Sequence, residues 1–257
     1  MTIIETIKKV IDHVDLTAEE AESVLEQIMI GRCTDAQIAS LLTALRMKGE
    51  TVAELTGFAR VMRRKAARVL AHTAVSAEIA DTEREALIDT CGTGGDVSGS
   101  FNVSTATAFV VAGGDVRVAK HGNRSVSSQC GSADVVEALG VKIELQPETI
   151  GRCIDEVGIG FLHAPLLHDA MKYVALARKQ MGIRTIFNML GPLTNPAGAN
   201  IQVVGVYAAH LTELIARVLG ELGSTRALVV HGSDGLDEIT ITAESKVTEL
   251  WKGELNT

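Results

Sequence analysis

The stretch ALIDTCGTGGDVSGSFNVSTATAFVVA, residues 86–112, decides how the rest of the sequence is interpreted. It predicts a strand over 86–89, a glycine-rich loop over 91–96 and a helix over 104–112. Because closely spaced glycines let backbone N–H groups approach a ligand, and a helix N-terminus adds positive charge, this loop suits phosphate or diphosphate. Val97 stands where a dinucleotide fingerprint needs glycine, and the lysine of a Walker A loop is missing. A tight turn without a ligand is the alternative.

The alternation of strands and helices continues towards the C-terminus. Further strands are predicted over 116–119, 141–145, 203–207 and 227–230, and further helices over 133–139, 147–157 and 211–222. This alternation is typical of a mainly parallel sheet flanked by helices, which binds ligands beyond the carboxyl ends of its strands. We therefore expect an α/β domain over 86–257.

The first seventy residues show only helical patterns. Ile4, Ile7, Ile11 and Val14 share one apolar face. Candidate capping boxes begin three further helices: Thr17 with Glu20, Thr34 with Gln37, and Thr51 with Glu54. We expect a small helical bundle over 1–70, a hinge over 71–85, and a helix at about 165–180 that packs with the bundle. The bundle is either a helical decoration without a function of its own or an interface, with its apolar faces continuing into a partner subunit.

Composition narrows the range of partners. The chain has 257 residues, 46% of them hydrophobic, and a formal net charge of −8. Such a protein repels phosphate-coated partners at long range, so we expect no nucleic-acid partner and no membrane partner. The four cysteines show no CxxC spacing, and the N-terminus lacks the features of a signal peptide, which favours a cytoplasmic protein without zinc.

Two further loops follow predicted strands. Residues 120–128 combine two cations with glycine and small hydroxyl donors, which favours an anion site over a solvated charge run. Residues 231–238 end in Asp237 and Glu238, hard oxygen donors that suit Mg²⁺, although alone they would be read as an acidic turn. Because loops after parallel strands meet at one edge of a sheet, the three loops together predict a site for a magnesium–diphosphate ligand.

Five motifs stand in a fixed order along the chain: Gly92–Asp96, Phe101–Thr105, Lys120–Ser128, Asn188–Pro196 and His231–Glu238. In sequence and order they resemble those of the anthranilate phosphoribosyltransferase family. The resemblance implies a fold like that of nucleoside phosphorylases and phosphoribosyltransferases, Mg²⁺ as cofactor, and a homodimer formed through the helical domain. It also implies an enzyme of tryptophan biosynthesis that transfers the phosphoribosyl group of 5-phosphoribosyl 1-diphosphate (PRPP) to the amine of anthranilate and releases diphosphate.

The resemblance assigns roles to individual residues. PRPP would be bound by Gly92, Gly95, Asp96, Ser100, Asn102, Val103, Ser104, Thr105, Lys120, His121, Gly122, Asn123, Arg124, Ser125, Val126, Ser127, Ser128 and Ser132. Anthranilate would be bound by Gly92, Asn123, Arg178, His121 and His168, and Mg²⁺ by Ser104, Asp237 and Glu238. Lys120 and Arg124 would stabilise charge on the leaving diphosphate, and no covalent nucleophile is expected. For His168, a purely structural role as a hydrogen-bonded helix residue is an equal alternative to binding anthranilate.

The sequence departs from the family pattern in four places. Val97 replaces a glycine, Gln129-Cys130 replaces Lys-Ser, and Leu176-Ala177 replaces Pro-Val before Arg178. Family members also continue well past Trp251, so we expect a truncated sequence that lacks part of the large domain. Two other functions stay open. One is a pyrimidine-nucleoside phosphorylase, whose substrate has no carboxylate for Arg178, and the other is an inactive truncated paralogue.

Overall fold

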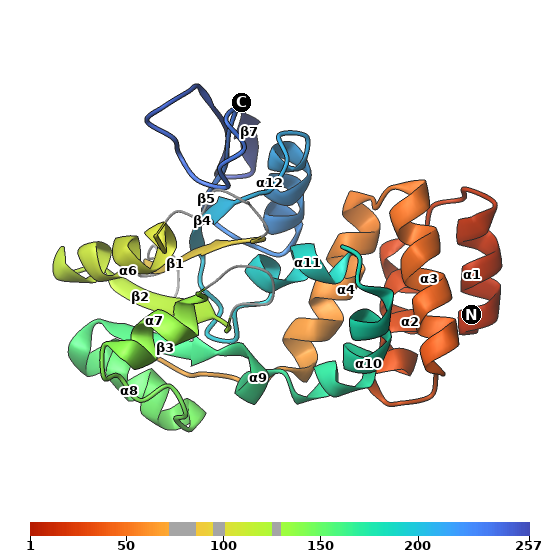
Figure 1. The fold of residues 1–257 in the computed structure, drawn as a ribbon, viewed down its shortest axis with the longest axis horizontal. Coiled ribbons are helices and arrows are strands. Elements are labelled where there is room, and N and C mark those ends of the chain that lie inside the picture. Colours follow the sequence, from red (N-terminus) through yellow and green to blue (C-terminus); the bar gives the residue numbers. More distant parts are fainter. Residues whose placement is uncertain (72–85, 95–100, 125–129) are drawn as a thin grey trace. The chain divides into compact units, whose positions relative to one another are not determined.

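The computed structural model describes residues 1–71, 86–94, 101–124 and 130–257, which form two compact units (Figure 1). The helical unit comprises Met1–Ala66 and His168–Thr194, and the α/β unit comprises Ala67–Leu167 and Asn195–Thr257. The expected hinge over 71–85 lies outside the described residues except for Ala71, which is buried in the core of the α/β unit. The chain therefore passes between the units at three places, next to Ala66, Leu167 and Thr194.

The helical unit contains α1 (Ile3–Ile11), α2 (Ala18–Met29), α3 (Asp35–Lys48), α4 (Val52–Lys65), η2 (Asp169–Met171), α10 (Lys172–Met181), α11 (Phe187–Leu190) and η3 (Gly191–Leu193). The capping boxes predicted at Thr17, Thr34 and Thr51 are confirmed, and Thr2 forms another with Glu5. In each box the threonine hydroxyl accepts a hydrogen bond from a first-turn N–H, and the acidic or amide side chain accepts one from the threonine N–H. Local sequence therefore sets where these helices begin.

The expected helix at about 165–180 is divided in the structure. α9 (Ala164–Leu167) belongs to the α/β unit, whereas α10 packs against α2 and α3 in the helical unit. Tyr173 of α10 lies so close to Gly31 that a Cβ there would be 2.8 Å from the ring. A side chain at Gly31 would thus push α10 away from α2.

The apolar face predicted on α1 does not enter the core of the helical unit. Ile4, Ile11 and Val14 are 52%, 60% and 48% exposed. The residues of α1 that are buried are Ile3, Thr6 and Val10, which form the neighbouring stripe. This stripe packs against α3 and α2, so a row of isoleucine and valine side chains stays open to solvent.

The α/β unit is built around a seven-stranded sheet with the order β3-β2-β1-β4-β5-β6-β7. Its strands are β1 (Leu87–Gly92), β2 (Arg117–Gly122), β3 (Ile159–His163), β4 (Ile201–Gly205), β5 (Arg226–Gly232), β6 (Ser245–Trp251) and β7 (Glu254–Asn256). The first five run parallel, and β6 and β7 are antiparallel. The predicted class, a helical bundle with a mainly parallel α/β domain, is confirmed.

One predicted strand is wrong. Residues 141–145 form no strand, and β3 instead pairs with β2 from Val118 with Ile159 to Gly122 with His163. Ile143 is buried, but it packs with α7 (Ser132–Ala138) and Phe161 rather than between two strands. The apolar residue that suggested a strand therefore covers a helix.

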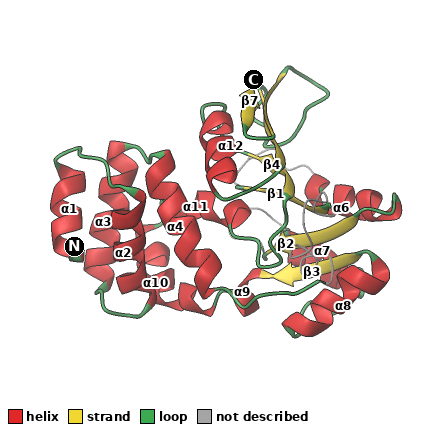
Figure 2. Ribbon diagram, turned by 180° about the vertical axis from the view of Figure 1, so that it is seen from behind, coloured by secondary structure: helices red, strands yellow, loops and turns green. Residues whose placement is uncertain are grey.

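Helices cover both faces of the sheet (Figure 2). Phe161 of β3 packs with α7, and the next residue, Leu162, packs with α8 (Pro147–Val157), so these helices lie on opposite faces. α6 (Val103–Gly113) contacts β1 and β2, and α12 (Leu211–Glu221) contacts β5 and β6. In the described part of the chain, no helix has the length and apolar character needed to span a membrane.

Candidate active site

The loops after β1, β2 and β5 carry most of the residues predicted to bind ligands. These parallel strands end at Gly92, Gly122 and Gly232, so the three loops leave the same edge of the sheet. β4, which ends at Gly205, lies between β1 and β5. The loop after β5 must therefore pass the end of β4 to reach β1.

Two glycines allow that passage. A Cβ on Gly205 would overlap the main-chain oxygen of Asp237, so only glycine lets the loop cross β4 this closely. The Asp237 side chain then reaches β1, where a Cβ on Gly92 would be 3.1 Å from its Oδ2. The structure thus brings buried Asp237 to the start of the glycine-rich loop.

The loop after β5 is held in shape by Asp234. Its Oδ2 accepts hydrogen bonds from the hydroxyls of Thr240 at 2.6 Å and Thr242 at 2.5 Å. These two hydrogen bonds lower the pKa of the Asp234 carboxyl group. The Gly232 N–H also donates to the Leu236 carbonyl at 2.8 Å. This turn directs the following residues, Asp237 and Glu238, back over the sheet.

The predicted metal ligands come together. Ser104 Oγ, in the first turn of α6, donates a hydrogen bond to Glu238 Oε1 at 3.1 Å, although the two residues are 134 positions apart. With Asp237 next to Glu238, the set offers one hydroxyl and two carboxylates. These hard oxygen donors fit Mg²⁺, which binds few protein groups and keeps places for water and substrate phosphates.

The first turn of α6 is fixed from two sides. Asn102 Oδ1 caps the helix by accepting the Thr105 N–H at 2.9 Å, which is the ordinary capping role that the sequence also allowed. Thr90 of β1 donates its hydroxyl hydrogen to the Ser104 carbonyl at 2.8 Å. Among the described residues, the buried hydroxyl of Thr105 has no hydrogen-bond partner. The assignment of Thr105 to the phosphoribosyl group stays a prediction.

The loop after β2 begins in the interior. Lys120 and His121 are only 3% and 7% exposed, and Lys120 Nζ donates to the His121 carbonyl at 3.1 Å. The hydroxyl of Ser132 occupies the space that a Cβ on Gly122 would need. The Asn123 carbonyl accepts hydrogen bonds from Ser132 Oγ at 3.3 Å and from the Ala133 N–H at 3.2 Å. Ser132 therefore packs against Gly122 and Asn123 at the described start of this loop.

Arg124 makes different contacts from those expected of a diphosphate ligand. Its guanidinium pairs with Asp134 at 3.0 Å and Glu137 at 2.8 Å, both on α7. Hydrogen bonds to Glu137 and Asp134 raise the pKa of this guanidinium. Binding a diphosphate would require Arg124 to leave these carboxylates, so its role in leaving-group stabilisation stays a prediction.

The remaining predicted residues lie in three places. Gly95, Asp96, Ser100, Ser125, Val126, Ser127 and Ser128 lie outside the described residues. Arg178 and His168 belong to the helical unit. Val103 is the first residue of α6. The assignments of all these residues to ligands stay predictions.

Arg178 and His168 sit in apolar surroundings. The Arg178 guanidinium lies 5.3 Å from the centre of the Phe187 ring, and Phe187 stacks with Phe58 at 6.3 Å. Burial lowers the pKa of Arg178, and burial lowers the pKa of His168 to about 4. His168 is therefore neutral at pH 7, whereas Arg178 remains a cation.

The sequence analysis missed four residues near the predicted site residues. Asp89 accepts the His121 N–H, Thr90 donates to Ser104, Phe187 contacts Arg178, and Asn195 donates to Asp89. Asp89 is the last residue of the strand predicted over 86–89 and Thr90 follows it, which is a recognisable signal because strands of parallel sheets are normally apolar. Asn195 lies in the motif Asn188–Pro196, for which no role was predicted. No local signal marks Phe187.

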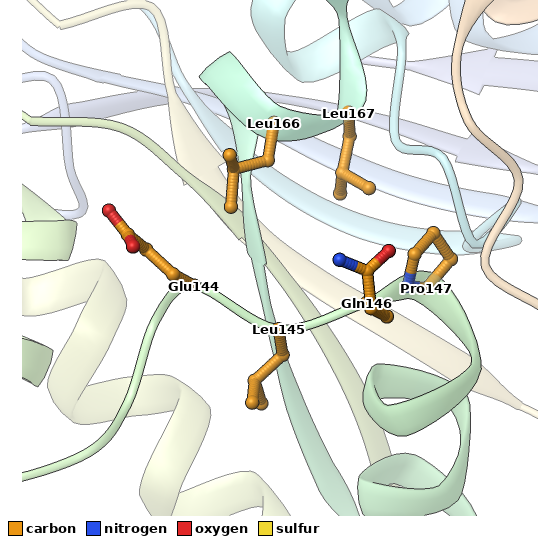
Figure 3. A pocket seen from close by; sticks show the side chains of 6 residues that line it. All are labelled: Glu144, Leu145, Gln146, Pro147, Leu166 and Leu167. Carbon is orange, nitrogen blue, oxygen red and sulfur yellow. The ribbon is translucent and has the colours of Figure 1, made fainter.

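A pocket with a cavity volume of about 280 Å³ lies elsewhere in the α/β unit. It is lined by Glu144, Leu145, Gln146, Pro147, Leu166 and Leu167 (Figure 3). None of these residues was predicted to bind a ligand, and Glu144 is the one charged group in the lining. The candidate site is therefore the loop edge of the sheet rather than this pocket.

Comparisons with known proteins agree with this geometry. Residues 4–66 match the model of a glycosyl transferase family helical bundle domain, and residues 84–257 match that of a glycosyl transferase family a/b domain. An anthranilate phosphoribosyltransferase of Moorella thermoacetica is 58% identical over 251 residues, which cover 98% of this chain and 71% of the relative.

Solved structures give the same result. The crystal structure of anthranilate phosphoribosyltransferase from Thermus thermophilus has a TM-score of 0.86 and 45% identity, covering 98% of this chain and 73% of that one. The Saccharomyces cerevisiae enzyme in complex with PRPP and Mg has a TM-score of 0.83 and 27% identity, covering 99% and 71%. This chain therefore belongs to the anthranilate phosphoribosyltransferase family.

Proposed function

We propose that this chain transfers the 5-phosphoribosyl group of PRPP to the amine of anthranilate, with Mg²⁺ as cofactor. The observation that carries the proposal is the meeting of Ser104 with Glu238 beside Asp237 and Gly92. The hard oxygen donors and Gly92, at the start of the glycine-rich loop, then lie at the same edge of the sheet. A magnesium–diphosphate group needs this combination.

The reaction exchanges one bond at the anomeric carbon of the ribose. The amine nitrogen of anthranilate bonds to this carbon as its bond to diphosphate breaks, and the electron pair of that bond leaves with diphosphate. The proton lost by the amine passes to water. Mg²⁺, when bound, neutralises part of the negative charge on the diphosphate.

The chain's own residues contribute binding and positioning. Lys120 and the glycine N–H groups after β1 would meet the negative charge that grows on the leaving group. The amine of anthranilate is already neutral and nucleophilic, so no side chain has to activate it. Holding the amine against the anomeric carbon supplies much of the remaining acceleration.

Arg178 favours anthranilate over a pyrimidine nucleoside. Its guanidinium contacts the Phe187 ring, and burial lowers its pKa, with no opposing contribution from an acidic side chain among the described residues. A desolvated cation gains from an anionic ligand, and a planar guanidinium pairs well with a carboxylate. Anthranilate has a carboxylate, whereas uridine and thymidine have none.

Calorimetry and two assays test the proposal. Calorimetry should show PRPP binding that tightens with Mg²⁺, and the fluorescence of anthranilate should fall as it is consumed. Phosphorolysis of uridine or thymidine would instead favour the nucleoside phosphorylase. A cooperatively unfolding chain that binds no PRPP would favour the inactive paralogue.

We further propose that the chain works in the cytoplasm as a homodimer formed through the helical unit. The exposed side chains Ile4 and Ile11 on α1 and Val14 just after it support an interface there, because contiguous apolar surface is normally covered. The four cysteines are free thiols, which suits a reducing compartment. Light scattering should give twice the monomer mass, and an Ile11→Asp variant should be monomeric.

A further inference from the structure

The central strand β1 contains two consecutive buried polar residues that the proposed chemistry does not use. Asp89 and Thr90 are 0% and 2% exposed, with strands β2 and β4 on either side. Central strands of parallel sheets are normally apolar, and an unpaired buried carboxylate is costly. Thr90 is explained by its hydrogen bond to Ser104. Asp89 needs its own explanation.

Both oxygens of Asp89 accept hydrogen bonds from groups at the candidate site. Oδ1 accepts the His121 N–H at 3.1 Å, and Oδ2 accepts Asn195 Nδ2 at 2.8 Å. Complete burial raises the pKa of the Asp89 carboxyl group, and the positive charge of Lys120 and the hydrogen bond from Asn195 act against this rise. Since both oxygens face donors, the carboxylate form fits the contacts.

Asn195 holds Asp89 and the neighbouring strand together. Its Nδ2 also donates to the Ala119 carbonyl of β2 at 2.8 Å, and its Oδ1 accepts the Ala197 N–H at 2.9 Å. Both the nitrogen and the oxygen of the Asn195 amide therefore make hydrogen bonds, and these contacts fix its orientation. Asn195, the last residue but one of the motif Asn188–Pro196, thus joins β1 to β2 by hydrogen bonds.

The result is a main chain at His121 that is held from two directions. Its N–H is bound by Asp89, and its carbonyl accepts Lys120 Nζ at 3.1 Å. The next residues, Gly122 and Asn123, pack against Ser132. A shift at His121 would consequently move the whole start of the loop over 120–128.

We propose that Asp89 and Asn195 are positioning residues for PRPP, which set the course of the loop after β2 through the His121 main chain. The inference rests on the proposed function, because it concerns the same PRPP site. Neither residue touches the substrate. They act on affinity by keeping Lys120 and its neighbours in the geometry that the phosphoribosyl group requires.

Two variants test this, with a matched control. Asp89→Asn keeps the size of the side chain but leaves one acceptor for two donors and removes the charge beside Lys120. Asn195→Ala removes the clamp. Asn200→Ala is the control, because Asn200 Oδ1 accepts the Leu87 N–H at 2.9 Å at the opposite, amino end of β1.

Calorimetry with PRPP and Mg²⁺, steady-state kinetics and thermal unfolding are measured on all variants of the full chain. Asp89→Asn and Asn195→Ala should raise the Kd and KM for PRPP about tenfold, which is about 1.4 kcal/mol, with kcat within about threefold of the parent. Asn200→Ala should lower Tm and leave both constants unchanged. A purely structural role would instead lower the active fraction, and hence kcat, without changing KM.

The outcomes separate the two proposals. If the parent chain binds PRPP and Asp89→Asn binds it equally well, the positioning role is wrong and the proposed function stands. If Asn200→Ala raises the KM for PRPP as much as the other two variants, the effect is general destabilisation and the inference fails. A parent chain that binds no PRPP overturns the proposed function and, with it, the inference.

Discussion

Buried polar groups are arranged differently in the helical unit and in the α/β unit. In the helical unit, Glu54 is fully buried and accepts hydrogen bonds from the Leu16 and Thr51 N–H groups and from Lys48. These contacts join turns to helices within the helical unit, and none of them involves a loop predicted to bind a ligand. In the α/β unit, Asp89 and Lys120 lie just below the edge from which the loops leave. We infer that buried polar groups next to the loop edge of the sheet serve the site, whereas those that join turns and helices stabilise the fold.

The largest effect should come from the site in the α/β unit. Glu238→Ala removes a carboxylate that would hold Mg²⁺, and we expect kcat/KM to fall about a thousandfold, or about 4 kcal/mol. Because Glu238 is a loop residue, Tm should change little. Titration of activity with Mg²⁺ checks this, with Glu249→Ala on β6 as the control. A large fall in Tm would make Glu238 a folding residue and break the comparison.

In the helical unit, His168 should act on stability through its protonation. Burial lowers its folded-state pKa to about 4, from 6.5 in the unfolded chain, so the unfolded state binds the proton more tightly. Its contribution is complete above pH 6.5 and lost as pH falls towards 4, by about 3 kcal/mol. Urea unfolding at pH 7, 5.5 and 4 should show a smaller loss in His168→Gln than in the parent.

An identical loss in both proteins would show that folding leaves the pKa of His168 at its ordinary value of 6.5. The folded protein would then gain a cation at His168 below that pH, and the helical unit would carry site charge as well as stability.

Arg178 is the residue of the helical unit assigned to the substrate. Arg178→Ala should raise the KM for anthranilate about thirtyfold, or about 2 kcal/mol, because the carboxylate loses its charged partner. The Kd for PRPP should stay unchanged, which calorimetry measures separately. Arg184→Ala, a change to an exposed arginine of the same unit, is the control. An equal loss of PRPP affinity would contradict the assignment to anthranilate.

The smallest effect should come from a helix cap. Thr17→Ala removes the hydroxyl that accepts the Glu20 N–H and should lower the free energy of unfolding by about 1 kcal/mol. Thr17→Ser keeps the capping hydroxyl and should retain most of the parent's free energy of unfolding. Both KM values should stay at the parent level, and a change in either would show that this end of the bundle is coupled to the site.

Sequence reasoning succeeded where a structure depends on neighbouring residues. The capping boxes need only a threonine and an acid or amide three residues later, and Pro147 marks the start of α8 at its first position. The glycine-rich loops were also predicted at the ends of their strands, because tight turns favour glycine and small polar residues. The convergence of the loops at one edge was expected from the parallel topology, and the family resemblance implied that Ser104 and Glu238 share a site.

Sequence reasoning failed where a side chain packs against residues that are distant in the sequence. Ile143 suggested a strand but covers α7, and the true strand β3 has no stronger pattern than the stretch it was confused with. The row Ile4 and Ile11 was predicted as an apolar face of a bundle helix, but it is the neighbouring stripe of α1 that is buried. Periodicity shows that a face is apolar, but it does not show what packs against it.

By itself, the sequence determined the fold class, the starts of the helices, the order of the loops and the types of group they carry, because each depends on short-range preferences or on chain order. Tertiary structure alone decided that Asp237 passes over Gly205, that Arg124 pairs with α7, and that Asp89 binds His121 and Asn195. Asp89 and Asn195 are 106 positions apart. Contacts at that separation depend on how strands and helices pack, which no local pattern encodes.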